Sequence, residues 1–484
     1  MVTKIQNKYE ARINNWKNKA MERGGELRSL KKRFKEMEAS RDLNRANWQK
    51  ERALREATIA EVKSLDKELN KLKHHSYDLD SVAICLAVKR SGTVSLRSWR
   101  AMLVTMCFVF EINFKVPCIN TLRNWEQKHG YHRLSKQGDP SVDYAIIIDE
   151  SFSIGGQSLL LVLGINLSVY KFDSSLRMSD IEVLAMEVKA SWKADDISAV
   201  IAKVQKRGYK LVYCCSDGGS NIVKSMKDSD IPRIYDCTHA LSILLKKEYE
   251  EQKMFKNFLK AYALLNRKNY MGQDTLICPP KLRGKSRFLN IYPIAEWAES
   301  TLKYLDFLSN KSNKKRTAGE KRVYKKLIWL NKYRDLIGEL IAISKLLKAV
   351  FKILKDEGLN EASIKSVKAI VSLSQAPLFI RVGILNYLEA QQIVLLLTGY
   401  TTMICCSDII ESYFGKFKYN QKRNPDKGIT IGCLDLVNYG QEINKSELKK
   451  AMESTKIVDL KKWQKENKLK SFNNRRKELR KKWG

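Results

Sequence analysis

The sequence is poor in histidine and has no cysteine pair spaced for metal binding. It contains five histidines in 484 residues, and four of them precede position 133. The ten cysteines are scattered without a Cys-x-x-Cys pair, and several lie in apolar runs typical of strands or helices. This pattern argues against a histidine-rich metal centre and a structural zinc site. It indicates a reduced, intracellular protein with buried thiols.

Long apolar runs are also missing. No run approaches the ~18 residues that a membrane-spanning helix needs. The first residues, Met1 to Lys19, are polar throughout, unlike a signal peptide. We therefore expect no membrane partner.

Acidic residues are few relative to basic ones. Lysine and arginine number 89 against 53 aspartates and glutamates, which gives a formal net charge of +36. Such an excess implies a polyanionic partner, because each neutralised phosphate releases condensed counterions. A lysine-rich composition can also reflect genomic base bias, so the placement of the charge is more informative than its total. Segment 461–484 carries eleven basic and two acidic residues, which is typical of a basic helix or tail that contacts phosphate.

The length predicts two to four domains, and the apolar fraction of 44% is that of a folded protein. Residues 1–76 are rich in charged residues and predict a long helix interrupted at Gly24-Gly25. A coiled-coil seam is indicated by the spacing of Val62, Leu65, Leu69 and Leu72. We expect a multimerisation arm here, and a solvated helix without a partner is the alternative.

Residues 77–137 predict a bundle of three short helices. The expected helices are 81–90, Leu96–Phe110 and Cys118–His129. Ser95 is the expected N-cap of the second helix, Pro117 precedes the third, and Gly130 is its expected C-cap. The order is typical of a helix-turn-helix DNA-binding domain, and an ordinary small bundle is the alternative. The third helix would present to a major groove Asn120, Thr121, Arg123, Asn124 and Lys128.

The next segment, 138–245, predicts a mixed sheet. Apolar runs indicate strands at 144–149, 157–167, 181–190, 209–217 and 232–238, with helices at 195–207 and 220–229. Three consecutive strands followed by alternating helix and strand is the order of an RNase H-like mixed sheet. The predicted fold class is therefore α+β and multi-domain.

After His239 the strand signal disappears, and helical periodicity continues to Leu397. We expect an all-helical insertion at 246–400 that interrupts the RNase H-like core. The second part of the core, 401–440, would contain a helix with Ser407 as its N-cap. A basic helix or tail, 441–484, would follow.

Three carboxylates stand where metal chemistry on phosphodiesters would need them. Asp149 and Asp217 each end an apolar strand, and Gly218-Gly219 after the second allows a close approach of the backbone. Glu411 lies one turn into the late helix, on the same face as Asp408. Two Mg²⁺ ions held by such carboxylates can stabilise both the attacking and the leaving oxygen. The alternative is that each aspartate only caps the next helix, and that Asp408 is an exposed first-turn carboxylate.

Three motifs carry a family resemblance over residues 140–420. The segment CSDGGSNIVKSM around Asp217 resembles the second-Asp motif of hAT-like transposases, and YDCTHALSILLKK resembles the Cys/His strand end that follows it there. SDIIESYFGKFK around Glu411 is similar to the terminal Glu helix of bacterial insertion-sequence transposases. The order of the acids and the long helical insertion are similar to those of RNase H-like DDE transposases. The Cys237-x-His239 spacing is tighter than is usual in the group, and no BED-type zinc finger precedes the core.

The resemblance implies metal-dependent cleavage at transposon ends and attack of a 3′-hydroxyl on target DNA. Asp149, Asp217 and Glu411 would be the ligands of two Mg²⁺ or Mn²⁺ ions, with Cys237 and His239 nearby and His239 contacting the scissile phosphate. The partners would be terminal inverted repeats, target DNA and further copies of the chain, in a homodimer or a higher homo-oligomer. The expected location is cytoplasmic and nucleoid-associated. An RNase H-like nuclease or domesticated recombinase that does not integrate, and a non-catalytic architectural protein, remain alternatives.

Further residues are candidates for contact with DNA. Trp297 could stack on an extruded base, although a buried packing role is the alternative. Basic residues next to the proposed site are better placed to contact phosphate. With the helix-turn-helix residues, the set is Arg123, Asn124, Lys128, Lys281, Arg283, Lys285, Arg287, Trp297, Lys416 and Lys418.

Overall fold

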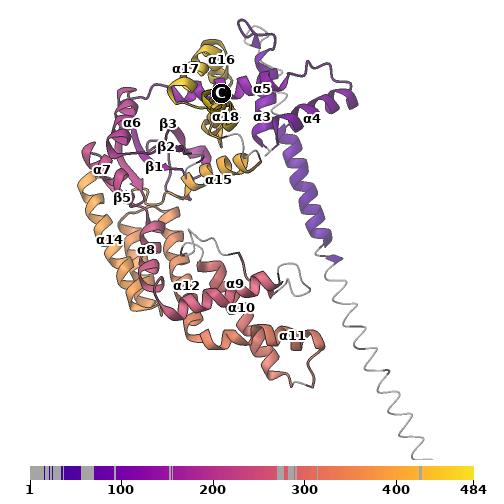
Figure 1. The fold of residues 1–484 in the computed structure, drawn as a ribbon, viewed down its shortest axis with the longest axis vertical. Coiled ribbons are helices and arrows are strands. Elements are labelled where there is room, and N and C mark those ends of the chain that lie inside the picture. Colours follow the sequence, from indigo (N-terminus) through magenta and orange to yellow (C-terminus); the bar gives the residue numbers. More distant parts are fainter. Residues whose placement is uncertain are drawn as a thin grey trace, which may run out of the picture. The chain divides into compact units, whose positions relative to one another are not determined.

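A computed structural model describes most of the chain (Figure 1). The described residues are 16, 21, 24, 34–35, 37–55, 70–91, 94–151, 154, 156–269, 277–281, 288, 291–312, 314–423 and 428–483. The chain divides into two units, Met1–Ser81 and Val82–Gly484. The fold is α+β, with many helices and one sheet of five strands.

In the first unit, residues 37–55 are helical and exposed, as expected for a charged arm. Leu72 is buried, but Val62, Leu65 and Leu69 of the predicted seam lie outside the described residues. The coiled coil therefore stays a prediction. Gly24 is helical, and Gly25 also lies outside the described residues.

Three helices follow, as predicted: α3 (Leu79–Ser91), α4 (Leu96–Val109) and α5 (Ile119–Leu134). Ser95 caps α4 by accepting a hydrogen bond from the backbone N–H of Ser98 at 3.1 Å. The prediction that α5 ends at Gly130 is wrong, because the helix continues to Leu134. Gly130 allows close packing instead, since a Cβ there would clash with the carbonyl oxygen of Leu434.

Helix α5 is a packing centre rather than an isolated recognition helix. It contacts the 3₁₀ segment η5 (Ile431–Asn438), α16 (Lys445–Ser454) and α17 (Ile457–Glu466). Most of its surface is therefore covered by the C-terminal part of the chain. The segment predicted as a basic helix or tail consists of α16, α17 and α18 (Phe472–Trp483), and Trp463 of α17 is part of the main core.

The sheet has the order β3-β2-β1-β4-β5. The strands are β1 (Asp143–Glu150), β2 (Ser158–Asn166), β3 (Glu182–Lys189), β4 (Lys210–Ser216) and β5 (Arg233–Tyr235). The first three pair antiparallel, and β4 and β5 run parallel to β1. All five predicted strands are confirmed.

Burial of both sheet faces explains the unbroken apolar runs of the strands. In β1, Ile146 and Ile148 belong to the core under α6 (Ala194–Lys206) and α7 (Ser220–Asp228). Ala145 and Ile147 belong to the larger core that continues into the helical part. The side chains of β1 therefore point alternately to the two faces of the sheet and pack against a different helical layer on each face.

The helical part between β5 and residue 400 is also confirmed, since the described residues there contain no strand (Figure 1). Its elements are α8 (Cys237–Tyr249), α9 (Lys253–Asn269), α10 (Ile291–Asn310), α11 (Ala318–Leu327), η3 (Ile328–Tyr333), α12 (Arg334–Asp356), α13 (Glu361–Leu373) and α14 (Leu378–Thr398). Helix α15 (Asp408–Arg423) then returns to β1 and η5.

Within the described residues, α14 alone is long and apolar enough to cross a membrane by length and composition. The sequence expectation overlooked this helix. Its inner face packs on α8 and β5, where the Tyr387 hydroxyl donates to the carbonyl of Tyr235 at 2.8 Å and Gln391 accepts from the N–H of Tyr235 at 2.8 Å. These bonds fix one face of α14 to the sheet.

A buried charge network joins α3, α5 and η5. Glu126 is 1% exposed, and its carboxylate accepts from Arg90 at 3.2 Å and from the Asn438 amide at 3.1 Å. Lys89 lies 3.9 Å from it. Burial alone would raise the pKa of Glu126, but the charges of Arg90 and Lys89 outweigh burial and lower it.

We predict that Glu126→Ala lowers the free energy of unfolding of the full chain by about 3 kcal/mol or more, because it leaves Arg90 buried without its main partner. Chemical denaturation followed by tryptophan fluorescence measures the loss. The control is Glu389→Ala on the exposed face of α14, which should stay within about 0.5 kcal/mol of the parent. Equal effects of the two variants would contradict this role of the network.

Candidate active site

Two predicted site residues end neighbouring parallel strands. Ile147 of β1 pairs with Cys215 of β4, so Asp149 and Asp217, each two residues further on, come side by side at the same edge of the sheet. Ile147 and Cys215 both face the larger core. Strand alternation directs the two carboxylates to that same face.

The carboxyl group of Asp149 has a strongly raised pKa. Burial raises its pKa to about 7, and the negative charge of Asp217 adds to the shift. One of its oxygens accepts from the backbone N–H of Glu150 at 2.7 Å. A buried carboxylate beside a second one favours a proton or a cation as its neighbour.

Asp217 is held by the turn that follows its strand. Its Oδ1 accepts from the backbone N–H of Gly219 at 2.9 Å, and its carbonyl accepts from Arg233 at 3.2 Å. A Cβ on Gly218 would lie 2.9 Å from the Tyr235 hydroxyl. Gly218 is therefore small because the side chain of Tyr235, on β5, lies against it.

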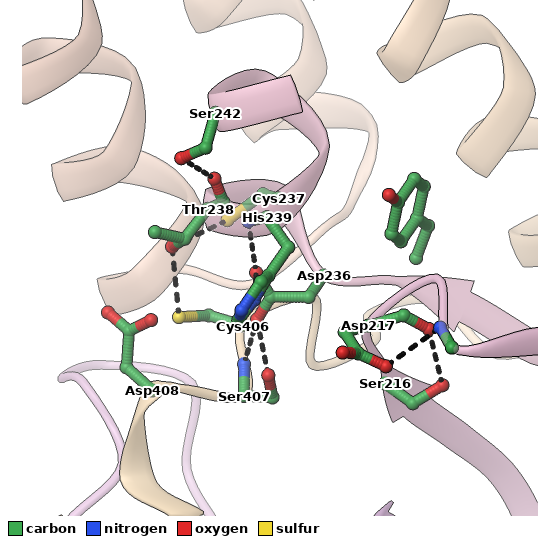
Figure 2. A network of polar contacts seen from close by, with 12 residues as sticks. Ser216, Asp217, Asp236, Cys237, Thr238, His239, Ser242, Cys406, Ser407 and Asp408 are labelled. Atoms are coloured by element: carbon green, nitrogen blue, oxygen red, sulfur yellow. Dashed lines mark hydrogen bonds and ion pairs between the residues drawn. The ribbon is translucent and has the colours of Figure 1, made fainter. Parts of the chain in front are cut away.

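A fourth acid, Asp236, lies beside His239 and was missed from the sequence. Its side chain is fully buried and caps α8 by accepting from the N–H of His239 at 2.7 Å. The same oxygen lies 3.2 Å from His239 Nδ1. The other oxygen accepts from the hydroxyl of Ser407 at 2.6 Å and from its backbone N–H (Figure 2). An aspartate three residues before a histidine, at a strand-to-helix junction, is the signal that could have revealed it.

His239 is half-buried, and its charge is set by the acids around it. The hydrogen bond to Asp236 raises the pKa of His239 to about 9 against the effect of burial. Asp217 and Glu411 raise it further, and the histidine in turn favours the ionised form of Asp149. The imidazolium therefore feels the charge of all three predicted carboxylates, while its hydrogen-bond partner is Asp236.

Glu411 lies in the first turn of α15, as predicted, with an exposed side chain. Ser407 does precede this helix, and its hydroxyl donates to Asp236. Asp408, the neighbouring acid, pairs with Lys355 of α12. The two acids of α15 thus have different roles. The charge of Glu411 raises the pKa of His239, and Asp408 accepts a hydrogen bond from Lys355.

Asp149, Asp217 and Glu411 do not form a close group of ligand atoms, but a different set of residues near His239 does. Among the described residues, Asp236, Cys406 and Asp408 form the group of three whose ligand atoms all lie within 4.8 Å of one another. The hydroxyl of Thr238 lies 3.7 Å from the sulfur of Cys406 (Figure 2). Asp236 already accepts four hydrogen bonds and Asp408 already has a lysine partner, so a cation here would have to displace existing bonds.

The cysteines bear out the expectation of buried thiols. All ten are free, and seven are buried. Burial raises the pKa of the Cys214 thiol to about 12. This thiol is therefore protonated at neutral pH and is a poor metal ligand.

Other predicted residues have structural partners or stay untested. Lys128 donates to the carbonyl of Met452 at 3.1 Å, and Trp297 donates to the carbonyl of Ile277 at 3.2 Å and packs edge-on against Tyr262. Lys416 lies 4.8 Å from the ring centre of Tyr439. The exposed candidates are Arg123, Lys281, Lys416 and Lys418, with Asn124 half-buried. Arg283, Lys285 and Arg287 lie outside the described residues.

Comparisons with known proteins add little. No protein-family model matches the chain, and no curated protein sequence matches it. Among solved structures, it is similar to the Drosophila P element transposase strand transfer complex, with 12% identity, coverage of 83% of this chain and 100% of that chain, and a TM-score of 0.42. A likeness of this grade says nothing about the chemistry of individual residues.

We predict that Asp149→Asn stabilises the metal-free protein at about pH 8 and much less at about pH 5. The native pKa of Asp149 is raised, so the folded state holds a proton that the unfolded state has lost between about pH 4 and about pH 7. Stability therefore falls as pH rises through that window. The variant should avoid this loss, which is on the order of 4 kcal/mol.

Thermal unfolding in a chelating buffer at both pH values measures the effect. The exposed Asp195→Asn variant should change the melting temperature by the same amount at both. A stabilisation by Asp149→Asn that does not depend on pH would refute the assignment of a buried, repelled carboxylate.

Proposed function

We propose that the chain is a DDE-type DNA transposase, which cleaves DNA at transposon ends and joins the 3′-hydroxyl to target DNA. The observation that carries this proposal is the pairing of β1 with β4, which sets Asp149 and Asp217 side by side at one edge of the sheet. The charges of Asp217 and Glu411 also raise the pKa of His239. Acids at the ends of adjacent parallel strands, completed by an acid from a distant helix, suit two-metal chemistry on phosphodiesters.

The donor set fits divalent metal ions. Asp149, Asp217 and Glu411 offer hard carboxylate oxygens, which Mg²⁺ and Mn²⁺ prefer. The raised pKa of Asp149 beside Asp217 marks negative charge without enough compensation. When bound there, two such ions would supply Lewis-acid stabilisation of the attacking and leaving oxygens.

Residues of the chain itself would position the phosphate. His239 is cationic at neutral pH and is fixed by Asp236, so its free Nε2–H can donate to a phosphate oxygen. Lys418 lies on the same helix as Glu411 and is exposed. Both groups bring positive charge to the edge of the sheet where DNA would lie.

The fold supports a split RNase H-like core. Asp149 and Asp217 end β1 and β4 at the middle of the order β3-β2-β1-β4-β5. The helices α8–α14 lie between Asp217 and Glu411 in the chain, in the place of the predicted all-helical insertion. Asp236 and Ser407 join the two ends of that insertion.

The partners follow from the reaction. The substrate is DNA, as terminal inverted repeats and target, which suits the net charge of +36. Two transposon ends must be held together, so the active form is a homodimer or a higher homo-oligomer. Free thiols suit a reducing cytoplasm, where the protein would be associated with the nucleoid.

The first test is Asp217→Asn. Mg²⁺-dependent nicking of DNA that carries the repeats flanking the gene should fall by at least about 100-fold, more than a loss of supporting groups costs. DNA binding should stay close to that of the parent. Asp228→Asn, on the exposed side of α7, is the matched control and should nick normally.

The products separate transposition from simple cleavage. Joined target DNA indicates a transposase, and cleavage without joined products indicates a nuclease or a recombinase that does not integrate. Normal nicking by Asp217→Asn would exclude the proposed site.

A further inference from the structure

Helices α17 and α18 enclose a basic groove of about 790 Å³ beside the sheet. Seven cationic side chains line it, with Glu478 as the acidic one. Lys461 and Lys465 lie one turn apart on α17, and Lys477 and Lys481 lie one turn apart on α18. We call these walls and the Lys468–Lys470 loop between them the C-terminal groove.

The C-terminal groove is built on the core and is not a loose tail. Leu469, in its floor, is 1% exposed and belongs to the main core together with Trp463. The side chain of Asn467 accepts from the backbone N–H of Val188 at 3.3 Å. This bond occupies an edge-strand donor of β3 and fixes the end of α17 to the sheet.

Most of the positive charge in the C-terminal groove is not neutralised. Lys470 pairs with Glu478 at 2.8 Å. In the part of the chain that the structure describes, no acid pairs with Lys461, Lys465, Lys468, Lys477 or Lys481. Unpaired lysines on facing walls of a concave site provide a strong field for a polyanion.

Lys468 also has an unusual backbone. Its φ of 49° lies in the left-handed region, where glycine or asparagine is at ease and a lysine is strained. Its side chain lines the groove, so the strained position places a positive charge there.

The groove lies next to the hairpin that carries Asp149. Gln157 lines it and donates to the carbonyl of Lys468 at 3.5 Å. Three residues later, Leu160 pairs with Glu150, the neighbour of Asp149. A polymer in the groove would therefore pass close to the proposed site.

We propose that the C-terminal groove binds the phosphate backbone of duplex DNA and guides it to the acids at the end of β1. The identification of the polyanion as DNA rests on the proposed function. Lysine ammonium groups contact phosphates without reading bases, so the binding is independent of sequence. The exposed lining is basic, with Leu469 buried beneath it, which suits a phosphate backbone better than a lipid surface.

The test compares two charge reversals of equal size. The groove variant is Lys465→Glu with Lys468→Glu, and the control is Lys365→Glu with Lys368→Glu on the exposed side of α13. Binding of a random-sequence DNA duplex is measured by fluorescence anisotropy with the full chain, in chelator and at several salt concentrations. The chelator separates binding from cleavage.

The groove variant should bind the duplex at least about tenfold more weakly. The slope of log K against log salt concentration should become shallower by about two, since each lost phosphate contact removes ~0.9 from it. The control should change Kd by less than about twofold, because it reverses the same charge outside the groove. Equal weakening of DNA binding in both variants, or no weakening in either, would overturn the proposal. The same holds if the groove variant loses binding to anionic lipid vesicles but binds DNA normally.

The outcome is independent of the proposed chemistry. Weak binding by the groove variant, with normal nicking by Asp217→Asn, would keep the groove and reject the active site. Normal binding by the groove variant, with inactive Asp217→Asn, would do the reverse.

Discussion

The proposed site depends on the hydrogen bonds that the buried carboxylate of Asp236 accepts. A fully buried charge is costly unless hydrogen bonds replace its water. Asp236 accepts from the backbone and the ring of His239 and from the backbone and the hydroxyl of Ser407. One side chain therefore holds the histidine of the site and the residue from which the Glu411 helix starts. Ser407 follows Asp236 by 171 positions, so this contact closes the helical insertion.

Other bonds close the same loop. The N–H of Cys237 donates to the carbonyl of Cys405 at 2.9 Å. The buried Tyr213 hydroxyl, on β4, accepts from the N–H of Ile404 at 2.9 Å. The segment before α15 is thus fixed to the strand that ends in Asp217. The insertion leaves the sheet at β5 and returns beside it, so its helices can pack outward without moving the third acid.

Groups of opposite charge lie near one another at this edge of the sheet. Asp149 and Asp217 repel each other, and His239 offsets part of that repulsion. The basic C-terminal groove begins at Gln157, at the same end of the β-hairpin as Asp149. Negative charge suited to metal ions and positive charge suited to phosphate therefore lie near the same end of one strand pair, as the proposed reaction on a polyanion requires.

The five strands could be predicted because both faces of the sheet are buried and each strand is an unbroken apolar run. Strand ends, and hence Asp149 and Asp217, follow from the same signal. Contacts between distant segments could not be predicted. Gly130 looked like a helix end because glycine often is one, but its small size serves a neighbour more than 300 residues away. The role of Asp236 depends on Ser407, which is distant in sequence. Lys128 was predicted to contact DNA, but it donates a hydrogen bond to the carbonyl of Met452 in α16.

The most direct measurement is the position of Mn²⁺ in crystals of the full chain, located by anomalous scattering. The account predicts manganese between the carboxylates of Asp149 and Asp217, with Glu411 completing the site. Manganese bound instead by Asp236, Cys406 and Asp408, with none at Asp149, would contradict it.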